Sequence, residues 1–407
     1  MINLLLHLRV EGFIDFRAVG NGCMGEMFIY NCDLNIEGFI HMLDDPTECY
    51  KFYWLDSIMQ MLGENAQNIT FDEVISGMIA DAWYSVTEYH LRMGTKDGQG
   101  NSVNSIERAV NKLYALEFLE PMADRSRIIS VIGQQGRLLY DEKYQISKNV
   151  PYRLLSSFLN ELGGNDPLWN QRKRLIAYLE LINKKGYIPY TIGTERGLKK
   201  RIIIGDKWKR FLIDNMVLIR GWIQMKKIKY LQDRNPGVPG IIYKLEPENE
   251  KQRKLQNVRK LWTAVIDVAA VRDIYSEKIL GQKGYEIDHF VPWSYITNDE
   301  MWNLMPVDAT INSSKKDKLA DWNKYFNSFA QNQFLLNEVV YKYSEIRKIF
   351  VSCQRDNLNA IWSTEELYLR GIEKVQFIKI LEERLRPIYD SARIQGYLIW
   401  RDELARG

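Results

Sequence analysis

The hexapeptide "NPGVPG" at Asn235–Gly240 constrains the fold of this 407-residue chain more than any other stretch. Two prolines and two glycines fill six positions, and proline removes a helix hydrogen bond, so no regular helix continues through them. A chain of 407 residues also exceeds the usual size of one hydrophobic core. We therefore predict two domains, residues 1–235 and 241–407.

Helical patterns dominate the part of the chain before the hexapeptide. Thr70 and Glu73 form a capping box ahead of the run "VISGMIADAWYSV", in which apolar residues lie three and four apart. Further helices are predicted over 166–186, which opens on Asp-Pro, and from 206 through 222. For the first forty residues, which mix glycines with apolar residues, we expect short strands or loops.

The second half of the chain combines helices with a short extended region. The pattern predicts a helix over 248–271 and a hairpin in "DIYSEKIL" at 273–280. Ser363 and Glu366 predict another helix start, and we expect that helix to end at Pro387. No alternation of strands and helices typical of a doubly wound sheet is present. The expected fold class is mainly α with a small α+β part.

Four cysteines are too few and too scattered for a disulfide framework, and none forms a Cys-x-x-Cys pair. A zinc site built from Cys23, Cys32 and His41 would have a spacing that matches no common zinc motif. We therefore expect no structural zinc and interpret the cysteines as buried free thiols.

The apolar opening "MINLLLHLRV" is interrupted by His7 and Arg9 and has neither a basic leader nor a small-residue cleavage site, unlike a signal peptide. Elsewhere no apolar run approaches the roughly 18 residues that a membrane span needs. We expect a cytoplasmic protein with no membrane partner.

The net charge of +3 is unevenly distributed. The segment from Arg172 to Lys229 contains sixteen basic residues and four acidic ones, and this positive excess favours binding of a polyanion. The alternative is a set of solvated helix faces, because helices scatter charges around their circumference. The candidates for nucleic-acid contact are Lys199, Lys200, Arg201, Lys207, Lys209 and Arg210.

An ordered set of polar residues begins in "YEIDHFVPWS", where Asp288 precedes one of only four histidines in the chain, His289. Asn303 follows fourteen positions after His289, Asn312 twenty-three positions after it, and Lys315 three residues later. Taken singly, the histidine would be a hydrogen-bonded core residue and the asparagines turn or cap residues. As an ordered set, they indicate a catalytic site.

This set resembles the HNH, or ββα-metal, endonuclease family, and most closely the branch that includes the HNH domain of RNA-guided CRISPR nucleases. "IDHFVPWS" is similar to the family's Asp-His-x-x-Pro-x-Ser strand, "NLMPV" to its second strand, and "NSSK" to its asparagine and lysine. The resemblance spans 273–318. It implies a C-terminal ββα-metal nuclease domain with its core at about 273–325 and flanking helices, preceded by a helical N-terminal region for substrate binding or regulation.

The chemistry of phosphodiester hydrolysis explains these residue types. A histidine with an ordinary pKa of about 6.5 can accept the proton of an attacking water, which is the role we expect for His289. Mg²⁺ takes few protein oxygens and keeps several waters, so the Asp288 carboxylate and the Asn312 amide oxygen suffice as ligands. Because side chains alternate along a strand, Asp288 would serve the metal (Mg²⁺, or Mn²⁺) and His289 the water.

The family resemblance implies two further roles. Asn303 would bridge the loop between the two strands and hold His289 in position. Lys315 would pair with a phosphate or with the developing charge. Without the zinc knuckle of some family members, the scaffold would be held by packing of Trp293, Trp302 and Trp322.

We expect a metal-dependent DNA endonuclease, and a wider resemblance to large bacterial HNH proteins implies a role in anti-phage defence. Two alternatives remain open: an RNA-cleaving toxic effector, since the site residues contact phosphate and metal rather than bases, and a non-catalytic nucleic-acid-binding subunit. Because an unrestrained nuclease endangers its host, we also expect a regulatory protein partner or an oligomer.

Overall fold

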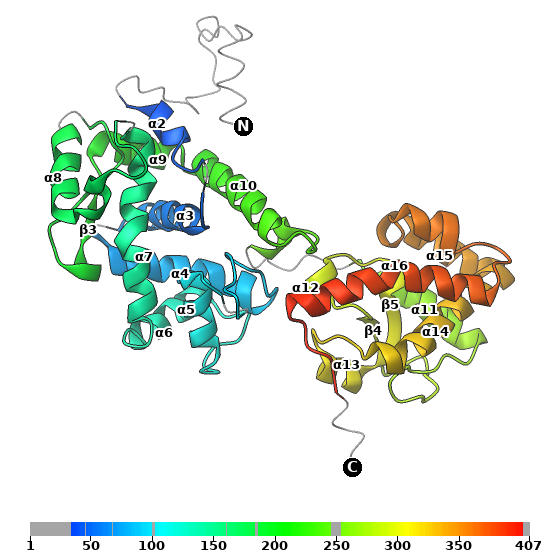
Figure 1. Cartoon of the computed structure of the whole chain (residues 1–407). Helices are drawn as coiled ribbons and strands as arrows, with labels where there is room; N and C mark the ends of the chain where they lie inside the picture. Colours follow the sequence, from blue (N-terminus) through cyan, green and yellow to red (C-terminus); the bar gives the residue numbers. More distant parts are fainter. Residues whose placement is uncertain are drawn as a thin grey trace, which may run out of the picture. The chain divides into compact units, whose positions relative to one another are not determined.

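The computed structural model describes residues 34–44, 46–66, 68–99, 102–159, 161–183, 186–245 and 254–401. Contacts divide the chain into two compact units. Unit 1 contains the described residues up to Asn235 together with Lys244 and Leu245, and unit 2 contains Pro236–Tyr243 and the described residues from Lys254 onward. Helices make up most of both units and strands are few (Figure 1), which confirms the predicted fold class.

Two buried helices, α3 (Tyr50–Gly63) and α4 (Phe71–Thr87), form the core of unit 1. The predicted capping box starts α4: the Thr70 hydroxyl accepts from the Glu73 amide at 3.2 Å, and the Thr70 amide donates to the Glu73 carboxylate at 2.9 Å. Trp54 on α3 and Trp83 on α4 are fully buried. The helix predicted at this position is thereby confirmed.

Further helices and a small antiparallel sheet surround this pair. The sheet has the order β1 (Ile69–Thr70), β3 (Arg201–Ile203), β2 (Thr191–Ile192). The surrounding helices are α2 (Ile36–Ile40), α5 (Ser105–Tyr114), α6 (Arg125–Gln134), α7 (Tyr140–Arg153), α8 (Arg172–Ile182), α9 (Asp206–Asp214) and α10 (Met216–Arg234).

Two predicted helices of unit 1 are interrupted. Asp166 caps only a 3-10 turn, Pro167–Asn170, and α8 begins afterwards at Arg172. The helix expected over 206–222 breaks at Asn215, whose side-chain amide donates to the Phe211 carbonyl at 2.9 Å and so competes with the backbone for it. Of the first forty residues, 1–33 lie outside the described part, and 36–40 are a helix rather than the expected strand or loop.

Unit 2 is built around a two-stranded antiparallel ribbon of β4 (Tyr285–His289) and β5 (Leu304–Asp308), in which Asp288 pairs with Met305 and His289 with Leu304. Its helices are α11 (Gln256–Val268), α12 (Trp293–Ile296), α13 (Ala309–Lys315), α14 (Trp322–Lys342), α15 (Ser344–Asn357) and α16 (Lys374–Gln395).

Aromatic packing holds the ribbon against α14. Phe290, directly after β4, stacks on Phe329 of α14 with ring centroids 4.5 Å apart. Gln333 of α14 donates to the Leu304 carbonyl at 2.7 Å, so the helix also supplies a hydrogen-bond donor to a backbone carbonyl of β5. Trp302 and Trp322 are buried, as the packing prediction requires, whereas Trp293 is half-buried.

Three predictions at the margins of unit 2 have different outcomes. The segment at 273–280 turns back on itself through one antiparallel bridge between Arg272 and Ile279. The helix expected over 248–271 is α11, and 248–253 lie outside the described residues. Both ends of the helix predicted from Ser363 to Pro387 are wrong. Ser363–Leu367 is a separate turn without a side-chain cap, and α16 begins only at Lys374. It then continues through Pro387 along a buried stripe that includes Leu385 and Tyr389, which offsets the missing hydrogen bond.

Cys49 and Cys353 are buried free thiols, as predicted, while Cys23 and Cys32 lie outside the described residues. Within the described ranges, no helix combines the length and the apolar character that crossing a membrane requires.

Candidate active site

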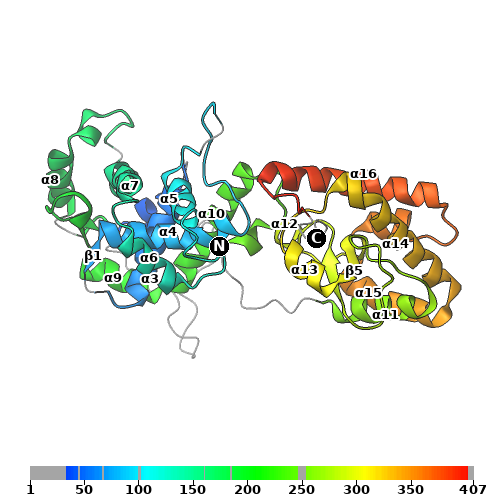
Figure 2. The same ribbon diagram turned by 90° about the horizontal axis from the view of Figure 1, so that it is seen from below.

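The ordered polar set lies on the ribbon and on the short helix that follows it. β5 ends at Asp308, which caps α13 by accepting from the Thr310 amide at 2.9 Å. The capped helix turns back beside the strands (Figure 1 and Figure 2). Strand, strand and helix therefore form a ββα arrangement.

Two parallel contacts join β4 to α13. Glu286 and Asp288 lie two positions apart and share one face of the strand. Asn312 donates its side-chain amide to the Glu286 carboxylate at 2.7 Å, and Lys315, one helical turn further on, places its ammonium 3.0 Å from the Asp288 carboxylate. The structure thus brings Asp288, Asn312 and Lys315 to one strand–helix junction.

Asp288 is a buried carboxylate with two donors. Lys315 is fully buried and donates both to Asp288 and to the His289 carbonyl, the latter at 3.0 Å. The Tyr275 hydroxyl donates to Asp288 at 3.3 Å. Burial, followed by the negative charge of Asp288, raises the pKa of Tyr275 well above its ordinary value, so the phenol remains a donor.

His289 belongs to a separate group of contacts. Its side chain lies on the opposite face of β4 from Asp288, and its Nε2 lies 3.0 Å from the Asp299 carboxylate. Asn357 donates to the Asp299 carbonyl at 2.7 Å, which fixes the backbone that carries this carboxylate. The side chains of Asp288 and His289 keep 7% and 4% of their surface exposed, respectively.

Asn303 is fully buried and holds the backbone just after β4. Its side-chain oxygen accepts from the Val291 amide and its side-chain nitrogen donates to the Val291 carbonyl, both at 2.8 Å. Its own carbonyl accepts from the Phe290 amide at 2.9 Å. These contacts fix the main chain that leaves His289, while the imidazole is held by Asp299.

The donors at the strand–helix junction fit a hard divalent cation. A carboxylate offers about four acceptor sites, and Lys315 and Tyr275 use three of those on Asp288. The Asn312 amide nitrogen donates to Glu286, so its oxygen would be the atom that an ion could bind. Among the described residues no three His, Cys, Asp or Glu side chains converge as a metal cage, and an ion such as Mg²⁺ needs none, because waters and phosphate complete its shell.

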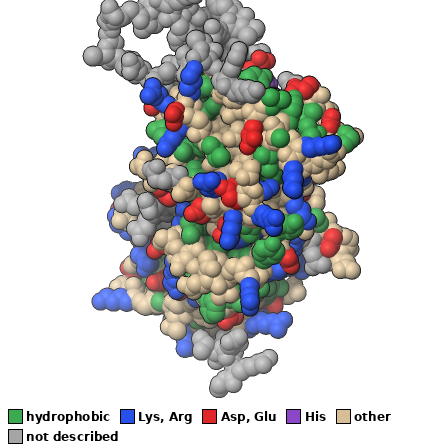
Figure 3. Space-filling model, turned by 90° about the vertical axis from the view of Figure 1, so that its left-hand side faces the viewer, with side chains coloured by type: hydrophobic (Ala, Val, Ile, Leu, Met, Phe, Trp, Pro, Cys, Tyr) green, Lys and Arg blue, Asp and Glu red, His purple; other side chains and the backbone are tan. Residues whose placement is uncertain are grey.

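The six basic candidates all lie in unit 1, around β3 and α9. Lys200 donates to the Tyr152 hydroxyl at 2.7 Å and Arg201 pairs with Glu195. The remaining four are Lys199, Lys207, Lys209 and Arg210. Figure 3, which looks onto the side of the molecule that carries α8, shows Lys and Arg side chains dispersed among acidic and apolar ones. Contact of the six basic candidates with nucleic acid stays a prediction.

Sequence reasoning missed three residues of the site. Glu286 was detectable, because it lies two positions before Asp288 and shares its strand face. Asp299 and Tyr275 carry no such signal, since each reaches the site from a loop. Only the folded chain places their side chains against His289 and Asp288.

Residues 272–320 match the family model described as HNH endonuclease. This match confirms the predicted HNH domain over that segment and indicates nuclease activity on nucleic acid, and HNH nucleases generally use divalent metal ions. The likeness to the CRISPR branch stays a prediction. No curated protein and no solved structure matches the chain.

Proposed function

We propose that this protein is a divalent-metal-dependent endonuclease that hydrolyses phosphodiester bonds of DNA, with Mg²⁺ or Mn²⁺ as the ion. The observation that supports the proposal is the junction of β4 and α13, where Lys315 pairs with Asp288 and Asn312 contacts Glu286 within the segment that matches HNH endonucleases.

Asp288 and Asn312 would hold the ion, which when bound supplies a positive charge to the phosphate and to the leaving oxygen. His289 accepts the proton of the attacking water. Since Asp299 contacts Nε2, the accepting atom is Nδ1, and Asp299 then stabilises the imidazolium. Lys315 keeps the Asp288 carboxylate and the end of β4 in place.

Digestion of supercoiled plasmid, linear DNA and RNA by the full chain, with Mg²⁺, Mn²⁺ or EDTA, tests this function. We expect cleavage of DNA that EDTA abolishes and that His289→Ala and Asn312→Ala lower at least about 100-fold. Asp267→Asn, an exposed carboxylate in the same unit, is the matched control and should cut normally. Cleavage that is the same in the His289→Ala protein would refute the proposal.

The DNA and RNA arms of the digest separate the proposed substrate from the RNA-cleaving alternative. Retained nucleic-acid binding without turnover would instead support a non-catalytic subunit. We further propose a cytoplasmic role in bacterial anti-phage defence, gated by a protein partner or by oligomerisation. The motivation is an HNH domain joined to a large helical unit. Equal plaque counts with the wild-type and His289→Ala genes across a broad phage panel would contradict this role.

A further inference from the structure

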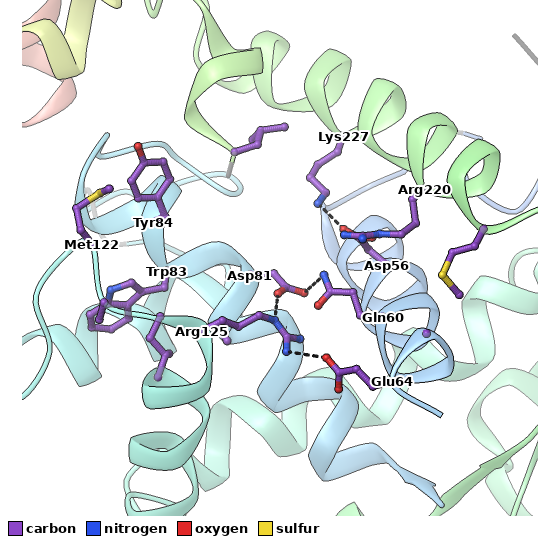
Figure 4. Close-up of a pocket in the computed structure, with 16 residues that line it drawn as sticks. Asp56, Gln60, Glu64, Asp81, Trp83, Tyr84, Met122, Arg125, Arg220 and Lys227 are labelled. Carbon is purple, nitrogen blue, oxygen red and sulfur yellow. Dashed lines mark hydrogen bonds and ion pairs between the residues drawn. The ribbon is translucent and has the colours of Figure 1, made fainter. Parts of the chain in front are cut away.

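A cavity of about 500 Å³ lies within unit 1, which does not contain the HNH segment. Four helices contribute to its wall: α3, α4, α6 and α10. Figure 4 shows Arg220 and Lys227 reaching in from α10 and Arg125 from the other side, with the carboxylates of Asp56 and Asp81 among them. The volume is within the range of small-molecule sites in proteins.

In this cavity two buried carboxylates each bind one arginine, in both cases through the Nε of the guanidinium. Asp56 on α3 accepts from Nε of Arg220 at 3.1 Å, and Asp81 on α4 accepts from Nε of Arg125 at 2.7 Å. Anchoring through Nε leaves the terminal Nη edge of each guanidinium, apart from a 3.9 Å contact between Arg125 and Glu64, and this edge can bind a carboxylate or phosphate bidentately. About a third of each arginine side chain is exposed: 37% for Arg220 and 34% for Arg125.

The two guanidinium groups are anchored at neighbouring positions. Asp56 and Gln60 are four residues apart on α3 and hence adjacent on its surface. Arg220 is bound to Asp56, while Gln60 donates to Asp81 at 3.2 Å, the carboxylate that holds Arg125. One ligand in the cavity can therefore contact both.

The charges of the inner part favour a bound anion. Lys227, which is buried, also lies 3.0 Å from Asp56, so three cations share the two carboxylates Asp56 and Asp81. The remaining carboxylate, Glu64, is 3.9 Å from Arg125 and exposed at the rim, where solvent weakens its charge.

The rest of the lining is largely apolar and includes Ala80, Tyr84, Met122, Ile128, Met216 and Leu245. Ion pairs that served only to tie the helices together would explain the Nε contacts, but they would not require an open space beside the Nη edges with an apolar side. An oxyanion joined to an apolar body uses both parts of the cavity.

We propose that this cavity binds a small organic anion, with its carboxylate or phosphate on the Nη groups of Arg125 and Arg220 and its apolar body against Met122 and Leu245. The site lies in a different unit from the proposed catalytic residues and does not depend on the proposed nuclease activity.

Binding to the full chain is measured by ligand-observed NMR and by the shift in melting temperature. The probes are phenyl phosphate, phenylacetate, inorganic phosphate and neutral benzyl alcohol. We expect the two aromatic anions to bind, inorganic phosphate to bind more weakly because it lacks the apolar body, and benzyl alcohol not to bind. Binding of phenyl phosphate alone assigns the site to phosphate esters, and binding of phenylacetate alone assigns it to carboxylic acids.

Arg220→Gln and Arg125→Gln should each weaken binding at least about tenfold, because each removes a charged hydrogen bond. Arg127→Gln, two positions from Arg125 on the same helix and exposed, is the matched control and should bind normally. Circular dichroism and the melting temperature without ligand establish that each variant folds. Failure of both aromatic anions to bind the wild-type chain, or equal binding by benzyl alcohol, would overturn the proposal irrespective of the variants.

Discussion

The ammonium of Lys315 lies 3.0 Å from the carboxylate of Asp288, and the two side chains are 0% and 7% exposed. Removing two charges from water costs several kcal/mol per ion, and mutual attraction repays it only when further hydrogen bonds complete the pair. Here the His289 carbonyl accepts from Lys315 and Tyr275 donates to Asp288. The pair therefore fixes α13 on β4 at the junction that carries the proposed metal ligands.

Replacing one partner of this ion pair should destabilise the protein more than replacing both. Lys315→Met leaves a buried carboxylate uncompensated, and we expect a loss of about 3–5 kcal/mol of stability. The double variant Asp288→Asn with Lys315→Met should recover most of it. Thermal unfolding of the full chain measures the effect, with exposed Lys348→Met as control. A double variant as unstable as Lys315→Met would contradict this account.

Substitutions of the two asparagines of the site should have different effects: loss of Asn303 should lower stability, and loss of Asn312 should lower activity. Asn303→Ala leaves the buried Val291 amide and carbonyl unpaired, at a cost of about 1–3 kcal/mol each, so the protein should melt earlier and exchange amide protons faster around Val291. Asn312 makes its contact at the surface, and Asn312→Ala should change stability by less than about 0.5 kcal/mol. It should nevertheless abolish cleavage.

Hydrogen exchange by mass spectrometry and a plasmid nicking assay measure the two effects side by side. If Asn312→Ala melts as early as Asn303→Ala, or if Asn303→Ala leaves exchange around Val291 unchanged, the division of roles is wrong.

Sequence patterns correctly predicted structural features that depend on residues close together in the sequence. The Thr70 capping box forms because both partners lie within one turn. By contrast, α16 passes through Pro387 because tertiary packing outweighs one lost hydrogen bond, which no window of sequence reveals. At the site, the spacing selected Asp288, Asn312 and Lys315, but we expected Lys315 to pair with a phosphate, whereas in the structure it is buried against Asp288. The spacing did not reveal the burial of Lys315 or the contact of Asp299 with His289, both of which depend on tertiary structure.

Asp299 should act as a positioning residue for His289. Asp299→Asn keeps the size of the side chain but replaces the accepting oxygen pair, so the imidazole loses its fixed orientation, and we expect cleavage to fall about 10- to 100-fold. DNA affinity and melting temperature should stay within error, because the backbone contact from Asn357 remains. Single-turnover cleavage and fluorescence anisotropy measure the two quantities, with Asp267→Asn as control. A loss of affinity that accounts for the whole decrease would exclude this role.

Lys244 should make the stability of the protein depend on pH near neutrality. The residue is fully buried and its ammonium lies over the Tyr89 ring, 5.3 Å from the centroid. Burial lowers its pKa from 10.5 to about 7. Below pH 7 both the folded and the unfolded chain carry the proton, so the full cost of burying the charge is present. Above pH 7 the folded chain loses the proton while the unfolded chain keeps it, and this cost declines.

Lys244→Met removes the titrating group and should therefore be more stable than the wild type at pH 6. The difference should narrow by about 1.4 kcal/mol per pH unit between pH 7 and 9, the slope for one proton. Thermal unfolding of the two proteins across this range measures the difference, and Lys379→Met, an exposed lysine, should give a constant offset. A difference that does not change with pH would show that Lys244 keeps its proton throughout the range.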